Sequence, residues 1–279
     1  MTAVPVAVAW GSATDVGRKR SLNEDSHLAA PPLFLVADGM GGHQAGEIAS
    51  ATVIAEFARL IGRPSLTVEL VQTTLHEARR RVDALPDGAG AGAGTTLAGV
   101  IVADIDGEGY WLAVNVGDSR TYRLSEDVFE QISVDHSVVQ ELIDAGQLDA
   151  ASAARDTRRN VITRALGAGS DGEADYWLLP AEQGDRIMVC SDGLPTEIDE
   201  ARIDLILRTE THPQAAADRL VREAVDAGGR DNVTVLVIDA LDVRVRGGRD
   251  SAQTIPSADM NEDVREDTLP RTRARGAHS

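Results

Sequence analysis

The stretch Phe34-Leu-Val-Ala-Asp-Gly-Met-Gly-Gly-His43 decides how this chain is interpreted. A short apolar run of strand length, residues 33–37, leads directly to a carboxylate at Asp38, and a glycine follows at once. A long helical pattern begins near Ala45, after two further glycines. Glycine lets the backbone approach a ligand closely and adopt angles that other residues resist. This order predicts a place where carboxylate and backbone oxygens converge on a small cation; a plain strand-to-helix turn is the alternative.

Composition limits the classes of protein and partner. The 279 residues are 43% hydrophobic but only 3% aromatic, so the core must consist of Ala, Val, Leu and Ile. This length suits one large domain, or one domain with a tail. The net charge of −18 argues against nucleic acid as a partner, because a phosphate backbone is bound by clusters of Lys and Arg.

The sequence shows no pattern for a membrane span or a secretion signal. No apolar run reaches the roughly 18 residues that a span needs, and the N-terminus lacks a basic region followed by an apolar core. A single cysteine, Cys190, excludes an internal disulfide and fits a reducing compartment. We therefore expect a cytoplasmic protein with Cys190 packed in the core. Surface or structural roles are expected for His27, His76, His136 and His212.

Hydrophobic periodicity predicts a chain of mixed strands and helices. The predicted strands cover residues 4–10, 33–37, 95–103, 110–116, 128–132, 176–179, 186–190 and 233–240, with another around Tyr122. The predicted helices cover residues 45–62, 65–85, 198–209 and 213–227. On the first helix the expected polar stripe is Thr52, Glu56, Arg59 and Arg63, opposite Ile54, Phe57, Ala58 and Ile61.

Three segments differ in character from the rest. Residues 134–175 hold one short helical pattern, 138–145, among polar stretches, and we expect an insertion that covers a site and moves. From about residue 244 the apolar periodicity ends, which predicts a disordered tail over 244–279. Residues 86–94 are glycine-rich but lack the Lys-Ser/Thr ending of a phosphate loop and precede a strand, so we expect a flexible connection.

Further carboxylates repeat the pattern of Asp38. Asp192 follows a predicted strand, Asp231 precedes one, and Asp118 lies in a turn after another. Carboxylate and carbonyl oxygens without Cys or His alongside favour hard divalent cations, Mg²⁺ or Mn²⁺, over zinc. Such carboxylates would repel one another without a cation, so a metal explains them economically. Two ions that share a carboxylate would activate a water molecule for phosphoester hydrolysis.

These motifs resemble those of the metal-dependent Ser/Thr protein phosphatases of type 2C in their bacterial form. The resemblance covers roughly residues 8–241, with the motifs in the family's order. They are Thr14-Asp-x-Gly17-x-x-Arg20-x-x-Asn23-Glu-Asp25, Ala37-Asp-Gly-Met-Gly-Gly-His43, Gly94-Thr-Thr-Leu97, Val116-Gly-Asp-Ser-Arg120, Cys190-Ser-Asp-Gly-Leu194 and Asp231-Asn-Val-Thr234. The resemblance implies an α+β fold, a four-layer αββα sandwich of two antiparallel sheets flanked by helices. The phosphatase domain would span residues 1–243, with residues 134–175 as the family's flap.

The resemblance also implies the metal ligands. Asp38 would bridge two ions, with the carbonyl of Gly39 on one ion and Asp192 and Asp231 on the other. Asp118, together with Asp192, would form a third and weaker position, as in bacterial members. The cofactors would therefore be two Mn²⁺ or Mg²⁺ ions, or three, bound where the ends of the two sheets meet.

Other residues would act on water, phosphate and the leaving group. Glu24 would hold metal-bound waters, and Arg20 would bind the substrate phosphate through its planar guanidinium. Asn160 falls where some members contribute to the third metal position. A metal-bridging hydroxide would attack phosphorus directly, without a phosphoenzyme. Eukaryotic relatives have His directly after Asp-Gly where this chain has Met40, so the proton donor stays open; His43 is one candidate, and a structural role at the helix start is the alternative.

The hypothesis is a signalling enzyme that dephosphorylates Ser and Thr in proteins and counteracts a Ser/Thr protein kinase. The alternative is a catalytically inactive member that serves as a regulatory binding module; the complete set of expected acids argues against it. In the tail, Thr254, Ser257 and Thr268 could be phosphorylated and read by a phosphothreonine-binding module, or the tail could be inert.

Overall fold

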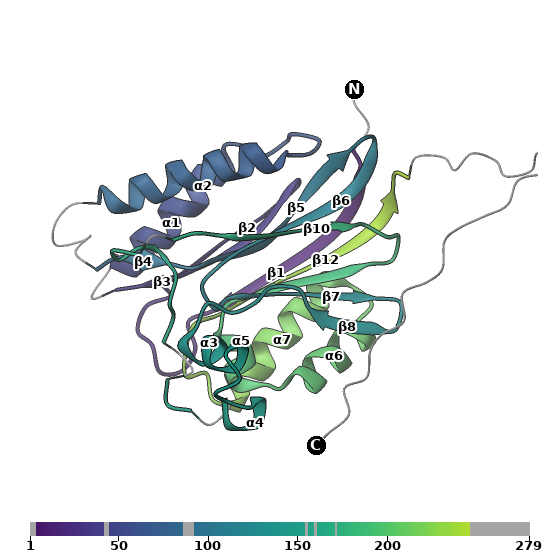
Figure 1. Cartoon of the computed structure of the whole chain (residues 1–279). Coiled ribbons are helices and arrows are strands. Elements are labelled where there is room, and N and C mark those ends of the chain that lie inside the picture. The colour runs from purple at the N-terminus through teal and green to yellow at the C-terminus, as the bar shows by residue number, and fades with distance from the viewer. Residues whose placement is uncertain are drawn as a thin grey trace, which may run out of the picture. The chain divides into compact units, whose positions relative to one another are not determined.

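Two antiparallel sheets lie face to face at the centre of the fold (Figure 1). The computed structural model describes residues 4–41, 45–85, 92–153, 156–158, 161–170 and 172–245, except the side chains at 150 and 151. In the described part of the chain, the first sheet contains, in spatial order, β1 (Val6–Asp15), β12 (Val233–Val243), β11 (Arg186–Cys190), β7 (Arg120–Ser125) and β8 (Val128–Gln131). The second contains β10 (Asp175–Pro180), β6 (Glu108–Val116), β5 (Leu97–Ile105), β3 (Leu33–Met40), β4 (Gly94–Thr95) and β9 (Leu166–Gly167), with β2 (Asp25–Ala30) paired to β3.

An apolar layer fills the space between the two sheets. Successive side chains of a strand point to opposite faces, so alternate residues reach this layer. From the second sheet, Phe34 and Val36 of β3 reach it together with Trp111 of β6, and they meet Val189 of β11 and Leu236 of β12. Face-to-face packing of this kind positions the ends of strands from both sheets relative to one another.

Helices cover the two outer faces and complete four layers (Figure 1). The outer face of the second sheet is covered by α1 (Ala45–Ala58) and α2 (Val68–Asp83). The outer face of the first sheet is covered by α5 (Gly193–Glu197), α6 (Glu200–Thr209) and α7 (Pro213–Ala227). The predicted four-layer αββα sandwich is confirmed. None of the helices in the described residues combines the length and apolar character needed to cross a membrane.

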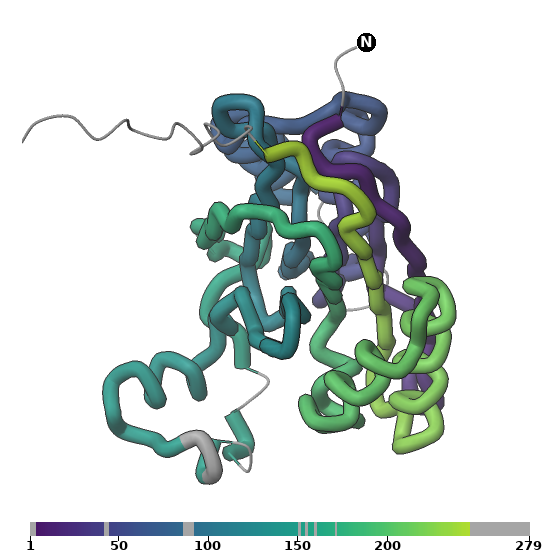
Figure 2. The backbone as a smooth tube through the Cα atoms, turned by 90° about the vertical axis from the view of Figure 1, so that its right-hand side faces the viewer, coloured from purple at the N-terminus to yellow at the C-terminus, as the bar shows by residue number. Residues whose placement is uncertain are grey.

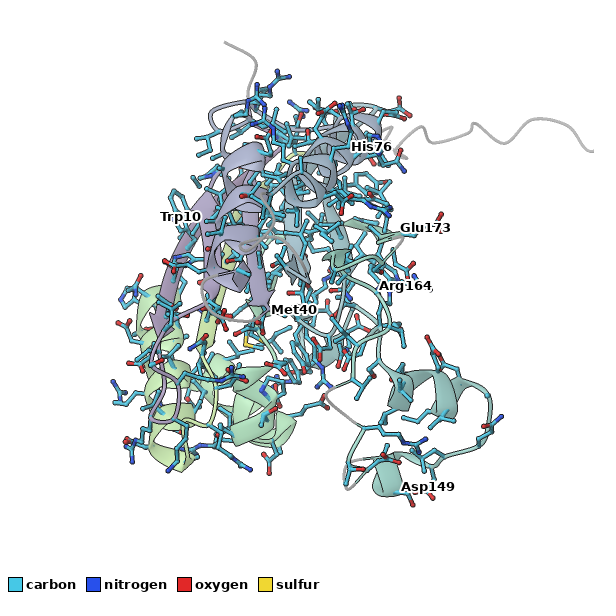
Figure 3. The ribbon with its side chains drawn as sticks, turned by 90° about the vertical axis from the view of Figure 1, so that its left-hand side faces the viewer. Trp10, Met40, His76, Asp149, Arg164 and Glu173 are labelled. Carbon is cyan, nitrogen blue, oxygen red and sulfur yellow. The ribbon has the colours of Figure 1, made fainter. Side chains whose placement is uncertain are left out.

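The insertion predicted at residues 134–175 extends from the body as a lobe (Figure 2). It contains α3 (Val138–Asp144), which Ser137 caps by accepting a hydrogen bond from the backbone N–H of Gln140 at 3.2 Å, and α4 (Ala150–Ala153). Figure 3 shows Asp149 towards the outer end of this lobe and Arg164 close to the body. We keep the name flap for residues 134–175.

The first helix differs from its prediction in length and in the face that it buries. α1 ends at Ala58 instead of residue 62, and Ile61 is 46% exposed. Glu56, expected on the polar stripe, is 6% exposed. Its carboxylate forms ion pairs with Arg59 Nη1 at 2.6 Å and with Arg81 Nε at 2.8 Å. The second pair forms because α2 lies alongside α1 and brings Arg81 close to Glu56. A partner from another helix cannot be read from the periodicity of one helix.

Several short elements lie outside the predicted set: β2, α5 and, inside the flap, α4 and β9, where no strand was expected. The first two concern the site. β2 has no strict alternation of apolar and polar residues, and it forms by pairing with β3 along its whole length. α5 is too short to give a periodic pattern, and it directly follows the turn at Asp192. Both elements place site residues, as the next section describes.

Candidate metal and phosphate site

Carboxylates from both sheets come together at neighbouring strand ends. Asp25 and Asp38 lie directly opposite each other in the pairing of β2 with β3. Asp192 follows the end of β11, and Asp231 precedes the start of β12, its antiparallel neighbour. Asp118 lies in the turn between β6 and β7. β7 is the neighbour of β11 in the first sheet, so this turn lies near Asp192. The sheet topology thus gathers acids that are far apart in the sequence.

The electrostatics of this cluster show that its members interact. Burial raises the pKa of Asp38 well above its ordinary value, and the charges of Asp25, Asp192, Asp118 and Asp231 add to this rise. Burial likewise raises the pKa of Asp118 to about 8, that of Asp25 to about 7 and that of Asp192 to about 6. A hydrogen bond with the Asp38 carboxyl opposes the rise at Asp192, so these two side chains are in contact. The cluster therefore favours a bound proton or cation over unshielded charge.

Threonine side chains hold the backbone of Asp38 in place. The N–H of Asp38 donates to Thr96 Oγ1 at 2.9 Å, and the N–H of Thr96 donates to the Asp38 carbonyl at the same distance. Thr95 Oγ1 donates to that carbonyl as well, at 2.9 Å. Thr96 Oγ1 also lies 2.8 Å from Ser119 Oγ, the residue after Asp118. One threonine thus connects the strand of Asp38 with the turn of Asp118.

Two buried carboxylate oxygens have no hydrogen-bond partner among the described residues: Glu24 Oε1 and Asp25 Oδ1. The second oxygen of Asp25 accepts from Ser191 Oγ at 2.8 Å and from Thr234 Oγ1 at 2.6 Å. The N–H of Glu24 donates to Asn232 Oδ1 at 2.8 Å, which fixes the position of its backbone. Burial raises the pKa of Glu24. An unpartnered buried carboxylate oxygen is costly, so both oxygens are suited to a cation or to water held by one.

Close backbone contacts explain the glycine at position 39. A Cβ at Gly39 would lie 2.2 Å from the carbonyl oxygen of Gly46, at the start of α1, so no larger residue fits. A Cβ at Gly46 would in turn lie 2.6 Å from Glu24 Oε1. The N–H of Gly39 donates to the Glu24 carbonyl at 3.2 Å. The close approach of these backbones places the peptide after Asp38 beside Glu24 and the start of the helix.

Arg20 lies at the rim of the cluster, with 48% of its side chain exposed. Its Nη2 donates to Asp231 Oδ2 at 2.7 Å. The loop that carries it is held by Asn232, whose Nδ2 donates to the carbonyls of Val16 and Leu22, both at 2.9 Å. A guanidinium at the edge of an acidic cluster is placed to bind an anion that also contacts a cation in the cluster.

The donor set fits hard divalent cations, although the side chains are not yet arranged as ligands. Within the described ranges, no group of three His, Cys, Asp or Glu side chains stands ready to hold an ion. Asp231 is paired with Arg20, and Asp38 is hydrogen-bonded to Asp192. Oxygen-only donors and unpartnered carboxylate oxygens match the preferences of Mg²⁺ and Mn²⁺.

A cavity of about 680 Å³ opens beside the carboxylates, between the flap and helices α5 and α6. Its lining includes Asp118, Asp192, Arg120, Val139, Pro195 and Glu200. Met40, the last residue of β3, lies in the body of the protein and outside the lobe (Figure 3). The cavity thus opens directly onto two of the clustered carboxylates, Asp118 and Asp192.

The structure brings together most of the predicted site residues and adds one. The same strand ends carry the predicted residues Arg20, Glu24, Asp38, Gly39, Asp118, Asp192 and Asp231. His43 and Asn160 lie outside the described residues, so both stay predictions. The added residue is Asp25, which belonged to a quoted motif but had no assigned role. Its place directly after Glu24 in that motif was the available signal. Cys190 is buried, as predicted, and burial raises the pKa of its thiol to about 12.

A family model and several relatives match this chain. The model described as "Protein phosphatase 2C" matches residues 17–226. A serine/threonine phosphatase, stp, of Listeria innocua is 35% identical over 239 residues, covering 81% of this chain and 93% of the relative. The serine/threonine protein phosphatase PstP of Mycobacterium tuberculosis is 36% identical over 287 residues, covering 98% of this chain and 52% of the relative.

Solved structures agree with the sequence matches. The catalytic domain of PstP in complex with two manganese ions superposes with a TM-score of 0.76 at 33% identity, covering 84% of this chain and 99% of that one. The phosphatase MsPP from Mycobacterium smegmatis, in complex with cacodylate, has a TM-score of 0.74 at 38% identity, covering 83% and 98%. In each of these two comparisons the likeness covers more than four fifths of this chain.

Proposed function

This chain belongs to the protein phosphatase 2C family of protein phosphatases, and we propose that it hydrolyses phosphoserine and phosphothreonine in proteins with the help of Mn²⁺ or Mg²⁺. The observation that carries this proposal is the buried cluster of mutually repelling carboxylates at strand ends of both sheets. Stability alone gives no reason to bury such a cluster, whereas a divalent cation makes it favourable. The comparisons give no support to the alternative of an inactive binding module.

We assign the cation ligands as follows. Asp38 and the carbonyl of Gly39 hold one ion, and Asp38 shares a second ion with Asp192 and Asp231. Asp118 joins Asp192 at a third and weaker position. When bound, the ions supply a nucleophilic water molecule at neutral pH and offset negative charge on the phosphoryl group. The manganese in the PstP structure supports this assignment by similarity.

The remaining groups act on water and phosphate. Glu24 Oε1, buried and without a partner among the described residues, accepts a hydrogen bond from water and orients it. Arg20, which pairs with Asp231 at the rim of the cluster, would donate two hydrogen bonds to the phosphate oxygens of the substrate. The guanidinium of Arg20 and the cations would together offset the negative charge on those oxygens. Met40 cannot donate a proton, so the donor to the leaving group comes from elsewhere; His43 is the candidate within the same motif.

Some proposals concern the setting of the enzyme. We propose residues 1–243 as the phosphatase domain, a Ser/Thr protein kinase as its counterpart, and the cytoplasm as its location, which a free buried thiol at Cys190 fits. The predicted tail lies outside the described residues from residue 246 onwards. In it we propose Thr254, Ser257 and Thr268 as candidate phosphorylation sites for a phosphothreonine-binding module.

The test is hydrolysis of a phosphothreonine peptide with and without manganese. We expect manganese-dependent turnover by the wild-type chain and a loss of at least about a hundredfold in Asp38→Asn and Asp231→Asn. Asp226→Asn is the matched control, because it makes the same change at a carboxylate whose side chain is 67% exposed. The assignment is wrong if Asp38→Asn keeps the activity of this control.

A further inference from the structure

A buried histidine contacts the turn that carries Asp118. His136 is 5% exposed and lies at the start of the flap. Its Nδ1 accepts a hydrogen bond from the backbone N–H of Gly117 at 3.2 Å, and its own backbone N–H donates to the Gly117 carbonyl at 2.9 Å. Because the Gly117 N–H is a fixed donor, Nδ1 must carry the lone pair and Nε2 the proton. His136 thus holds both polar backbone groups of the residue before Asp118.

The residue next to this histidine holds the other end of the same turn. Arg120 donates from Nε to both oxygens of Asp135 at 3.0 Å and from Nη2 to Oδ2 at 2.7 Å. Gly117 has φ +101°, and a Cβ there would lie 2.6 Å from a side-chain carbon of Thr96. Asp135 and His136 therefore bind the turn on both sides of Asp118, at Arg120 and at Gly117. The backbone conformation of that turn requires glycine at position 117.

The opposite edge of the imidazole ring reaches the far end of the flap. Nε2 donates to Asp175 Oδ2 at 3.1 Å, at the start of β10. Arg164 Nη1 donates to the other oxygen of Asp175 at 3.1 Å, and the N–H of Thr163 donates to the His136 carbonyl at 2.8 Å. Ser137, the next residue, caps α3. One side chain thus joins the beginning of the flap, its end and the turn of Asp118.

We propose that His136 is a positioning residue that couples the seat of the flap to the placement of the Asp118 carboxylate. While the flap packs against the body, the His136 ring accepts the hydrogen bond from Gly117 and so fixes the backbone next to Asp118. If the flap moves away from the body, this hydrogen bond is lost. The inference rests on the cation role proposed above for Asp118. Sequence spacing could not reveal it, because the ring partners Gly117 and Asp175 lie 19 and 39 positions away in the chain.

Two substitutions separate the two sides of the ring. In His136→Asn, the amide oxygen occupies nearly the position of Nδ1, so the acceptor for Gly117 is kept and the donor to Asp175 is lost. In His136→Gln, the longer side chain can place its amide nitrogen near the position of Nε2, so the donor to Asp175 is kept and the acceptor for Gly117 is lost. Both variants remove the imidazole, so a role in filling volume alone predicts similar results for the two.

The experiment uses the full chain and three readouts: manganese binding by equilibrium dialysis, hydrogen exchange of the Gly117 and flap amides, and the melting temperature. We expect His136→Gln to weaken the weakest manganese position roughly tenfold, as loss of a residue that orients a ligand does. Exchange at Gly117 should accelerate by a comparable, roughly tenfold factor, because its N–H loses its acceptor. His136→Asn should stay close to the wild-type chain in manganese binding and in exchange at Gly117, even if both variants melt at lower temperature. Its flap amides should exchange faster, because the donor to Asp175 is lost.

Asp118→Asn is the reference for loss of the weak position. If it weakens manganese binding while His136→Asn and His136→Gln behave alike, the inference about His136 is overturned and the proposed site stands. Faster exchange at Gly117 without weaker manganese binding also overturns the coupling. If Asp118→Asn leaves manganese binding unchanged, the cation role of Asp118 fails, and the inference fails with it.

Discussion

Asp25 and Asp38 lie directly opposite each other across β2 and β3, and burial raises the pKa of both carboxyl groups. Like charges directly opposite in an antiparallel pair are destabilising. The pair is tolerated because the strand residues before Asp38 are fully buried and because Ser191 and Thr234 donate to Asp25. The metal-free protein therefore holds local repulsion that a divalent cation would relieve.

The metal-free protein should become less stable as the pH rises through neutrality. In the folded state the pKa of Asp192 is raised to about 6, that of Asp25 to about 7 and that of Asp118 to about 8. In the unfolded chain these groups titrate near their ordinary value of about 3.9. The folded state thus binds more protons above that value, so the stability that these groups contribute is fully present below about pH 4 and is lost as the pH rises through 6 to 8.

Calorimetry with a chelator at about pH 5.5 and about pH 8.5 tests this, with an expected fall in melting temperature of at least about 5 °C at the higher pH. Added manganese should remove most of the difference, because the ions replace the protons. A melting temperature that rises with pH in the chelator would contradict the assignment of the cluster.

Asp38→Asn should separate function from stability. The amide has nearly the same volume but no charge, so repulsion in the cluster is reduced. We expect the metal-free variant at about pH 8 to be more stable than the wild-type chain by about 1–3 kcal/mol, since one pKa unit of relieved repulsion is worth about 1.4 kcal/mol. Manganese should stabilise the variant much less than the wild-type chain. Lower stability in the chelator would show that Asp38 serves the fold instead.

Arg20→Ala and Arg18→Ala distinguish phosphate binding from long-range attraction. Both substitutions remove one positive charge from the same loop. Arg18 is 54% exposed and pairs with Asp226, which is 67% exposed, and such surface pairs contribute about 1 kcal/mol or less. We expect Arg20→Ala to raise KM for a phosphopeptide by about 10–100-fold, as loss of a charge-assisted contact does. Steady-state kinetics over a range of salt concentrations measure both variants; equal effects would favour general attraction over a direct contact.

Asp185 should matter for stability and not for catalysis. Its side chain is fully buried, and it accepts hydrogen bonds from Trp111 Nε1 at 2.9 Å and from Arg123 Nε and Nη2 at 3.1 and 3.0 Å. Asp185→Ala removes the nearest carboxylate of the largely buried Arg123 guanidinium and leaves Trp111 Nε1 without its acceptor, which should lower the free energy of unfolding by about 3–5 kcal/mol. Denaturant unfolding measures the loss, and turnover per folded molecule should be unchanged at low temperature. Asp226→Ala, at an exposed ion pair, should lower stability by no more than about 1 kcal/mol.

The sequence pattern predicted the regular parts of the fold well. The helix predicted over residues 65–85 rests on the repeat of Val71, Leu75, Ala78, Val82 and Leu85; on α2 the first four are buried, and Leu85, just after the helix, is half-buried. The periodicity of α7 and the strand runs at β5, β6 and β12 were also correct, because burial of a face imposes a repeat on the residues that form it. The prediction was wrong for Glu56, since its burial depends on arginines that include one from another helix.

The amino-acid sequence by itself determined which oxygen donors the protein has, that they stand at the ends of strands, and which family the chain resembles. Only the tertiary structure decided that Asp25 meets Ser191, 166 positions away, that Arg20 holds Asp231, and that His136 contacts the turn of Asp118. The reason is physical. Composition and local periodicity follow from each segment alone, whereas pKa values, ion pairs and cation affinity depend on distance and burial, and these arise only when the two sheets pack together.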